Sequence, residues 1–320
     1  MLLLDEMTAA LPTDLVENVL RVVRAQADEG RGVIYISHRF TEISELCDSA
    51  TVLRDGRSVG TFATSDLDRA ALVRHISGET RAATPRPPAR AGAARLEVTG
   101  LTLPGRFRDI SFAAHAGETL VLTGLVGAGR SEVVETVFGL RQASAGQVIV
   151  DGTPLTGGGP AGAIAAGLAL VPEDRRGLGL ALGLGLSDNI ALPSLADFMT
   201  RAGLSRRRQH AHTAAQVREL GIRTAGTGTL CSKLSGGNQQ KAVIAKWLTT
   251  GAGVYLLDEP TQGVDVGAKA EIYALIDRLR ATGCAIVAVS SDLEEVLNIA
   301  SRVITLQHGR ITGHFTGQEI

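Results

Sequence analysis

The chain has 320 residues, a formal net charge of −1 and 44% hydrophobic residues, which indicates a soluble globular protein with room for two domains. The balanced charge does not favour nucleic-acid binding, and Cys47, Cys231 and Cys284 form no CxxC pair of the kind used for metal or redox chemistry. No apolar run reaches the roughly 18 residues of a membrane span. Asp5 and Glu6 interrupt the N-terminus where a secretory signal would stay apolar, so we expect a cytosolic protein that reaches any membrane through partners.

The first segment in chain order is one copy of an internal repeat. LLDEMT at 3–8 recurs as LLDEPT at 256–261, and the same offset without a gap aligns ISH at 36–38 with VSS at 289–291. A single register that holds over about sixty residues predicts two copies of one structural unit at opposite ends of the chain.

The two copies differ in what precedes them, and this difference predicts the domain organisation. About 160 residues with further motifs lie ahead of the second copy, whereas only Met1 and Leu2 lie ahead of the first. We therefore expect residues 1–79 to be the C-terminal part of a first, N-terminally truncated domain. Residues 80–94, rich in Pro, Ala and Arg, are expected to be a linker, and residues 95–320 a nearly complete second domain.

From residue 95 onward, strand patterns alternate with helix patterns. Strands are predicted at 95–103 and 109–124, and a helix is predicted at 130–140. The later runs at 253–259 and 284–291 are apolar throughout, which is typical of parallel strands buried on both faces. The fold class is therefore expected to be α/β, with its chemistry at the carboxyl ends of the strands.

The segment GLVGAGRS at 124–131 resembles a phosphate-binding loop in which arginine replaces the usual lysine. Its glycines allow backbone N–H groups to face phosphate oxygens at the start of a helix. A glycine-rich turn without a ligand is the alternative. The candidate nucleotide-binding residues around this loop are Gly124, Gly127, Gly129, Arg130, Ser131 and Glu132.

Two carboxylates end the apolar strand VYLLDE. Asp258 is suited to hold Mg²⁺ together with Ser131, and Glu259 is suited to polarise the water that attacks a γ-phosphate. An apolar strand that ends in two acids is often merely structural, so this interpretation depends on the glycine loop that precedes it.

LSGGNQQK at 234–241, followed by LLDEPTQGVD at 256–265, resembles the signature and Walker B pair of ABC ATPases. Together with VPEDR at 171–175 and GVDVGAK at 263–269, these motifs are similar to monosaccharide-import ATPases of the ribose, galactose and xylose type. The resemblance implies a P-loop NTPase fold with a RecA-like parallel sheet core, an antiparallel β edge and a helical subdomain. It also implies ATP and Mg²⁺ as cofactors.

The resemblance assigns further residues to the nucleotide site. Glu173 takes the position of the Q-loop glutamine near Mg²⁺, and Asp265 that of the D-loop aspartate. The signature of one domain faces the γ-phosphate that the other domain binds, in a nucleotide-dependent head-to-tail pairing. The residues implied for this contact are Ser235, Gly236, Gly237 and Gln239.

The resemblance also implies two unequal sites. His38 takes the position of the switch histidine after Glu6, and both are candidate catalytic residues of the first site together with Glu259 in the second. At the second site Ser291 replaces that histidine and cannot titrate near neutral pH. The guanidinium of Arg130 is planar and bulkier than an ammonium group. We therefore expect the second site to bind ATP with slow or no hydrolysis.

The function implied is the ATPase subunit of an ABC importer, which couples ATP binding and hydrolysis to monosaccharide uptake. Its partners would be membrane permease subunits and, through them, a periplasmic or extracellular sugar-binding protein, with no nucleic acid. The subunit would be cytoplasmic and peripheral on the inner face of the cell membrane. A nucleoside-import ATPase and a non-catalytic truncated remnant are the alternatives.

Two smaller expectations concern segments near these motifs. Phe107 is the one aromatic residue upstream of the glycine loop that is available to stack on adenine, although its spacing is poor. The glycine-rich stretch 157–167 is expected to be a flexible connector, because it does not directly follow a strand.

Overall fold

The computed structural model describes most of the chain and divides it into two compact units. The units are Met1–Thr84, and Pro85–Val264 with Ala268–Ile320. Among the described residues, no helix is both long and apolar enough to cross a membrane. Residues 80–91 of the expected linker lie outside the description, so its bounds stay a prediction. The described residues are 1–5, 7–8, 13–37, 40–54, 56–68, 71–72, 75 and 92–319.

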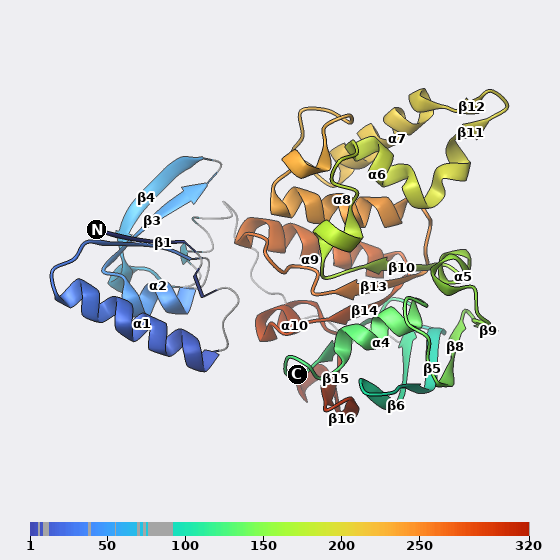
Figure 1. Cartoon of the computed structure of the whole chain (residues 1–320), viewed down its shortest axis with the longest axis horizontal. Helices are drawn as coiled ribbons and strands as arrows, with labels where there is room; N and C mark the ends of the chain where they lie inside the picture. The colour runs from blue at the N-terminus through green and yellow to red at the C-terminus, as the bar shows by residue number, and fades with distance from the viewer. Residues whose placement is uncertain are drawn as a thin grey trace. The chain divides into compact units, whose positions relative to one another are not determined.

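A largely parallel sheet forms the core of the second unit (Figure 1). Its strand order is β10-β13-β14-β7-β15-β16, and only β16 runs antiparallel to its neighbour. Every residue of β13 and β14 is buried, which confirms the expectation drawn from their continuously apolar sequences. The strands are β7 (Thr119–Thr123), β10 (Leu168–Val171), β13 (Val254–Asp258), β14 (Ala285–Val289), β15 (Arg302–Gln307) and β16 (Arg310–Thr316).

An antiparallel sheet in the order β6-β5-β8-β9 lies beside this core, and a helical part with a short hairpin extends from the other side (Figure 1). Both were expected from the P-loop fold. The sheet comprises β5 (Ala94–Leu103), β6 (Phe107–His115), β8 (Ala145–Val150) and β9 (Thr153–Pro154). The helical part comprises α6 (Leu186–Ala191), α7 (Arg206–Glu219), α8 (Gly236–Leu248) and the hairpin β11 (Met199–Thr200) with β12 (Gly203–Leu204).

The remaining helices of the second unit pack around the parallel sheet. The expectation of a flexible connector at 157–167 is wrong, because this stretch contains α5. Pro160 stands in the first turn, where its missing N–H costs nothing, and Ala163 is fully buried. These helices are α4 (Arg130–Val137), α5 (Gly159–Ala165), α9 (Val266–Ala281) and α10 (Leu293–Ile299).

The first unit repeats the last elements of the second unit almost residue for residue. The bounds of α1, α2, β3 and β4 coincide with those of α9, α10, β15 and β16 at the sequence offset, and both β-hairpins carry a register shift at the same place. The internal repeat is therefore also a structural repeat. Its elements are β1 (Leu2–Asp5), α1 (Thr13–Asp28), β2 (Val33–Ile36), α2 (Phe40–Leu46), β3 (Ser49–Arg54) and β4 (Arg57–Ala63).

The sheets of the two units differ at one place. In the second unit β7 pairs with both β14 and β15, whereas β1-β2 and β3-β4 form two separate sheets in the described part of the first unit. Leu3 is 65% exposed and Ile34 is 49% exposed on one face of β1-β2. Their counterparts Leu256 and Val287 are fully buried. The same strands thus have both faces covered in one unit and one face covered in the other.

A buried ion pair joins the starts of β7 and β15. The Glu118 Oε1 atom accepts a hydrogen bond from Arg302 Nε at 2.7 Å, and Oε2 accepts one from the His115 backbone N–H at 2.9 Å. Burial by itself raises the pKa of Glu118, but the hydrogen bonds from Arg302 and His115 outweigh it and leave the pKa below its ordinary value. The pair therefore stabilises the fold while Glu118 is ionised.

The substitution Glu118→Gln is expected to lower the free energy of unfolding by about 2 kcal/mol at neutral pH, because it leaves Arg302 without its charged partner. Since the folded pKa lies below the unfolded value of about 4.5, this contribution is present above that pH and is lost as the pH falls further. Urea unfolding at pH 7 and pH 3 measures both effects. An equal difference between the two proteins at both pH values would contradict the assignment.

Candidate nucleotide-binding site

The glycine-rich loop follows β7 and leads into the N-terminus of α4. Gly124 has a φ of 151°, and a Cβ atom at this position would lie 2.2 Å from the Leu306 carbonyl oxygen on β15. Gly127 and Gly129 have φ values of 83° and 92°, and the space beside Gly127 is open. The loop is thus anchored at one end and accessible at its middle. Backbone N–H groups at a helix N-terminus favour an anion.

Ser131 and Asp258 meet beside this loop. The Ser131 hydroxyl donates a hydrogen bond to Asp258 Oδ1 at 3.0 Å. Burial raises the pKa of Asp258 to about 7; the Ser131 hydrogen bond lowers it, and the negative charges of Glu173 and Glu259 raise it further. A buried carboxylate with acidic neighbours and a hydroxyl partner is a donor set that suits a divalent cation.

Asp258 and Ser131 fit Mg²⁺ of the kind that nucleotide sites use. In the described part of the chain, no three His, Cys, Asp or Glu side chains form a metal cluster. Mg²⁺ bound with a nucleotide needs only one or two protein ligands, because phosphate oxygens and water supply the others. The residues therefore match a cation that arrives with its nucleotide.

Glu259 faces Arg130 across the same site. The Arg130 Nη1 atom lies 3.5 Å from Glu259 Oε1, and both side chains are nine-tenths buried. Within the described structure, this buried Nη1 atom makes no hydrogen bond, and the Glu259 carboxylate is its charged neighbour. Glu259 has a φ of 44°, which is unusual for a residue other than glycine and marks a backbone that the surrounding fold holds in place.

Ser291, at the position predicted for the switch residue, contacts the Glu259 carboxylate. Burial raises the pKa of Glu259, while hydrogen bonds from the Ser291 backbone and side chain, and the charge of Arg130, partly offset the rise. The Glu259 backbone N–H donates to the Val289 carbonyl at 2.9 Å, which ties the end of β13 to the end of β14. The geometry places Arg130, Glu259 and Ser291 together.

Arg175 was not singled out from the sequence, yet it connects three of the predicted motifs. Its guanidinium donates to the carbonyl oxygens of Gln262 at 2.6 Å and Gly263 at 3.0 Å. The Gln262 side chain in turn donates to Glu173 Oε1 at 3.1 Å. A Cβ atom on Gly236 would lie 2.9 Å from the Gly263 carbonyl oxygen as well as from Arg175 Nη2, so a larger residue would meet backbone where α8 begins. Three loops that are distant in sequence therefore pack as one assembly.

The signature residues lie at the start of α8. Ser235 is exposed and its hydroxyl accepts a hydrogen bond from Asn238 at 2.8 Å, while Gly237 is buried. Among the hydrogen bonds and ion pairs of the described residues, none joins Ser235–Gly237 to the loop 124–129. Their predicted contact with a nucleotide held by another domain stays a prediction.

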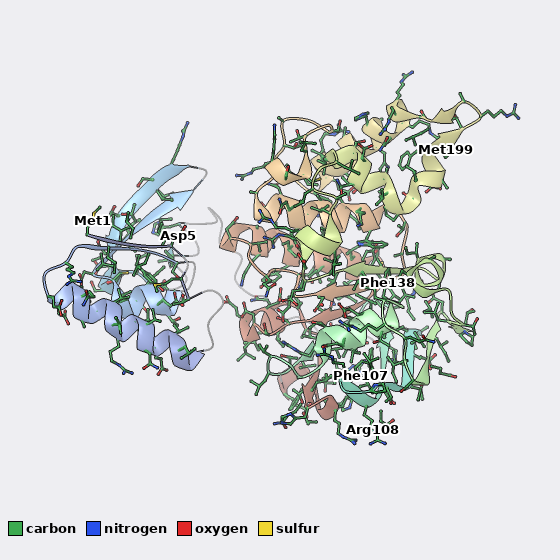
Figure 2. All side chains as sticks on the ribbon, viewed as in Figure 1. Met1, Asp5, Phe107, Arg108, Phe138 and Met199 are labelled. Atoms are coloured by element: carbon green, nitrogen blue, oxygen red, sulfur yellow. The ribbon has the colours of Figure 1, made fainter. Side chains whose placement is uncertain are left out.

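Other candidate residues lie in less accessible places. Gln239 is 1% exposed and donates to the Cys231 carbonyl, so its side chain has no surface to offer a ligand. Phe107 is 3% exposed within β6 (Figure 2), and its burial excludes the expected stacking on adenine. Glu132 remains near the loop and pairs with an arginine at 3.2 Å. Glu6 and His38 lie outside the described residues.

Comparison with known protein families places this geometry in context. Residues 107–262 match the family described as ABC transporter. The chain is 46% identical over 321 aligned residues to the ribose import ATP-binding protein RbsA 2 of Streptomyces coelicolor, covering 99% of the chain and 62% of that protein. It is 43% identical to the ribose import ATP-binding protein RbsA of Cereibacter sphaeroides, covering 64% of that protein. The chain thus spans less than two thirds of the length of these relatives.

Solved structures share the fold. A nucleotide-free ATP-binding cassette from an ABC transporter superposes with a TM-score of 0.60 at 19% identity, over 71% of this chain and 93% of the cassette. A dimeric ATP-binding cassette bound to ADP and Pi also superposes with a TM-score of 0.60, at 18% identity, over 70% of this chain and all of the other. These likenesses confirm the expected α/β P-loop architecture.

Proposed function

Because this chain belongs to the ABC transporter ATPase family, we propose that it binds ATP with Mg²⁺ as part of an importer for a small sugar. The observation that carries the proposal is the convergence of the glycine loop, the Ser131–Asp258 pair and Glu259 at the carboxyl edge of the parallel sheet. The loop would hold the phosphates through its backbone N–H groups and through Arg130. Glu132 lies at the same helix N-terminus.

Ser131 and Asp258 would hold Mg²⁺, with Glu173 close enough to influence its charge. When bound, the ion would offset the negative charge of the phosphates. Asp258 is 3% exposed and is held by the Ser131 hydroxyl, so both donors are already oriented before a ligand arrives. Orientation before binding reduces the ordering that binding would otherwise require.

The site is better arranged for holding ATP than for hydrolysing it. The positive charge of Arg130 would attract phosphate, but its planar guanidinium does not reproduce a compact ammonium group between two phosphates. Glu259, the candidate base, is held by an ion pair with Arg130 and by hydrogen bonds from Ser291. Loss of one well-placed charge typically lowers a rate by about 10²–10³-fold. Glu6 and His38 would serve a separate, competent site.

The proposed partners follow from the relatives, which are named ribose import ATP-binding proteins. We place the chain on the cytoplasmic face of the cell membrane with permease subunits and, through them, a sugar-binding protein. Residues 1–79 and 95–320 would belong to two nucleotide-binding domains, and the chain would form a head-to-tail dimer in the presence of nucleotide. A nucleoside is the alternative cargo.

The purified chain is expected to bind Mg²⁺–ATP and to hydrolyse it close to the background rate. Titration calorimetry measures binding, and phosphate release measures turnover. Arg130→Ala should weaken ATP binding by about tenfold, because a phosphate loses a charged donor, whereas Arg207→Ala on the exposed face of α7 removes the same charge without effect. Rapid turnover that Glu259→Gln abolishes would refute the slow-hydrolysis part, and absence of ATP binding would favour a non-catalytic remnant.

A further inference from the structure

Glu295 on α10 is a buried acid that the proposed site does not use. Its side chain is 1% exposed. The Thr261 hydroxyl donates to Oε1 at 2.8 Å and the Ser290 hydroxyl donates to Oε2 at 2.7 Å. Each carboxylate oxygen therefore holds a different loop.

The two loops are those that surround Glu259. Thr261 follows Glu259 by two residues and begins the segment whose carbonyl groups Arg175 binds. Ser290 directly precedes Ser291, which hydrogen-bonds to the Glu259 carboxylate. Through these two hydroxyls, Glu295 contacts both the loop after β13 and the loop after β14.

The first unit contains the same arrangement at the repeat positions. The Thr8 hydroxyl donates to Glu42 at 2.8 Å and 2.9 Å, and the Ser37 hydroxyl donates to Glu42 at 2.7 Å. Glu42 is 2% exposed. An acid, a threonine and a serine thus occupy matching positions in both copies, with matching hydrogen bonds.

A tyrosine joins each cluster, but it comes from a different element in each unit. Tyr35 on β2 donates to Glu42 at 2.8 Å, whereas Tyr273 on α9 hydrogen-bonds with Thr261. The sequence offset does not align these two tyrosines. The phenol hydroxyl thus contacts the acid in the first unit and the threonine in the second, although the acid, threonine and serine occupy matching repeat positions.

Burying this acid is unfavourable for folding. Burial raises the pKa of Glu295 to about 7, and the hydrogen bonds from Ser290 and Thr261 offset the rise only in part. The ion pairs of the described residues include none to Glu295. An apolar side chain would fill the space at lower cost. What the carboxylate provides is two strong acceptors directed at two loops.

We propose that Glu295 is a positioning residue that holds Ser291 and the segment 261–263 in one fixed arrangement around Glu259. This inference rests on the ATP site proposed above. The corner formed by Glu259 and Ser291 would meet the γ-phosphate, whereas ADP is held by the loop 124–131 alone. Glu295 therefore contributes to the binding of ATP and not to the binding of ADP.

The test compares the affinities for Mg²⁺–ATP and ADP by titration calorimetry on the full chain. Thr261→Val removes one hydroxyl with little change of shape and is expected to weaken ATP binding about tenfold, because a bond to a carboxylate is lost. ADP binding should change by less than about twofold, since its contacts lie elsewhere. Glu295→Gln should act in the same direction, and Thr261→Ser, which keeps the hydroxyl, should restore ATP binding.

Glu118→Gln is the matched control for a general loss of stability. It weakens a buried contact at the opposite end of β7 and should leave both affinities unchanged at a temperature where the protein is folded. The double variant with Thr261→Val and Glu295→Gln should bind ATP within about twofold of the weaker-binding single variant. The two effects should not add, because both substitutions act on one contact.

The outcomes separate this inference from the function on which it rests. Equal weakening of ATP and ADP binding by Thr261→Val and Glu295→Gln, or no change in either, overturns the positioning role while the ATP site stands. A wild-type chain that binds neither nucleotide overturns the proposed function and this inference with it.

Discussion

The substitution Gly124→Ala is expected to abolish nucleotide binding and to destabilise the second unit by about 3 kcal/mol or more. The added Cβ atom would meet the Leu306 carbonyl oxygen at 2.2 Å, and a backbone oxygen inside the parallel sheet cannot turn aside as a side chain could. The φ of 151° adds strain for any residue with a Cβ atom. Thermal unfolding and ATP titration measure the two effects.

Gly152→Ala is the matched control for this prediction. Gly152 also has a positive φ, of 76°, but nothing lies within 4 Å of the added Cβ atom. The Gly152→Ala substitution should lower the free energy of unfolding by about 1 kcal/mol, from backbone strain alone, and leave ATP binding unchanged. If Gly124→Ala behaved like Gly152→Ala, the close approach of the loop to β15 would not be needed for the site.

The substitution Asp258→Asn is expected to have opposite effects on binding and stability. It should weaken Mg²⁺–ATP binding by about a hundredfold, because the buried carboxylate that Ser131 contacts can no longer bind the cation. It should also raise the melting temperature, since the folded state raises the pKa of Asp258 to about 7 and therefore disfavours its charged form at neutral pH.

Titration in EDTA provides the control for Asp258→Asn. Without a divalent cation, the Asp258 carboxylate has no cation to hold, so the wild-type chain and the variant should bind ATP within about threefold of each other. An equally large loss of affinity in EDTA would assign Asp258 a structural role in place of cation binding.

The sequence was sufficient to predict the internal repeat, the parallel core sheet and the strand ends that carry the candidate site residues. The repeat that aligns 3–8 with 256–261 without a gap predicts helices and strands with matching bounds in the two units, and the structure has them. Identical spacing puts the turns and helix ends at equivalent residues. The strand ends that carry Asp258 and Ser291 could be predicted for the same reason. Continuous apolar runs of this length are typical of parallel strands whose two faces are both covered by helices.

Side-chain direction was not predictable from these patterns. Phe107 and Gln239 stand next to the expected site in sequence, yet both point into the interior. Phe107 is buried because side chains alternate between the two faces of strand β6, and Gln239 because it lies on the inner face of helix α8. Arg175 could not be assigned because its acceptors are backbone carbonyls 87 and 88 residues away. Because every residue has a backbone carbonyl group, the sequence does not show which ones accept these hydrogen bonds.

The buried acids could have been recognised from the sequence, because they recur at the same position of the internal repeat. Glu42 and Glu295 occupy the same repeat position, as do the threonine and serine residues that bind them. In a single copy, Glu295 in the run LEEVL has the pattern of a solvent-exposed helix face. Only its recurrence with both hydroxyl partners distinguishes it, and a contact across three elements becomes visible only in the folded chain.

The half-covered strands of the first unit have a consequence for how the chain unfolds. Helix α4 packs against β13 and β14, and no counterpart of it is found in the described part of the first unit, where the apolar cluster formed around Val16, Leu20 and Val23 is small. A layer with fewer buried contacts opens at a lower free energy. Melting of this chain is therefore not a single cooperative event, and one transition temperature would average two unequal ones.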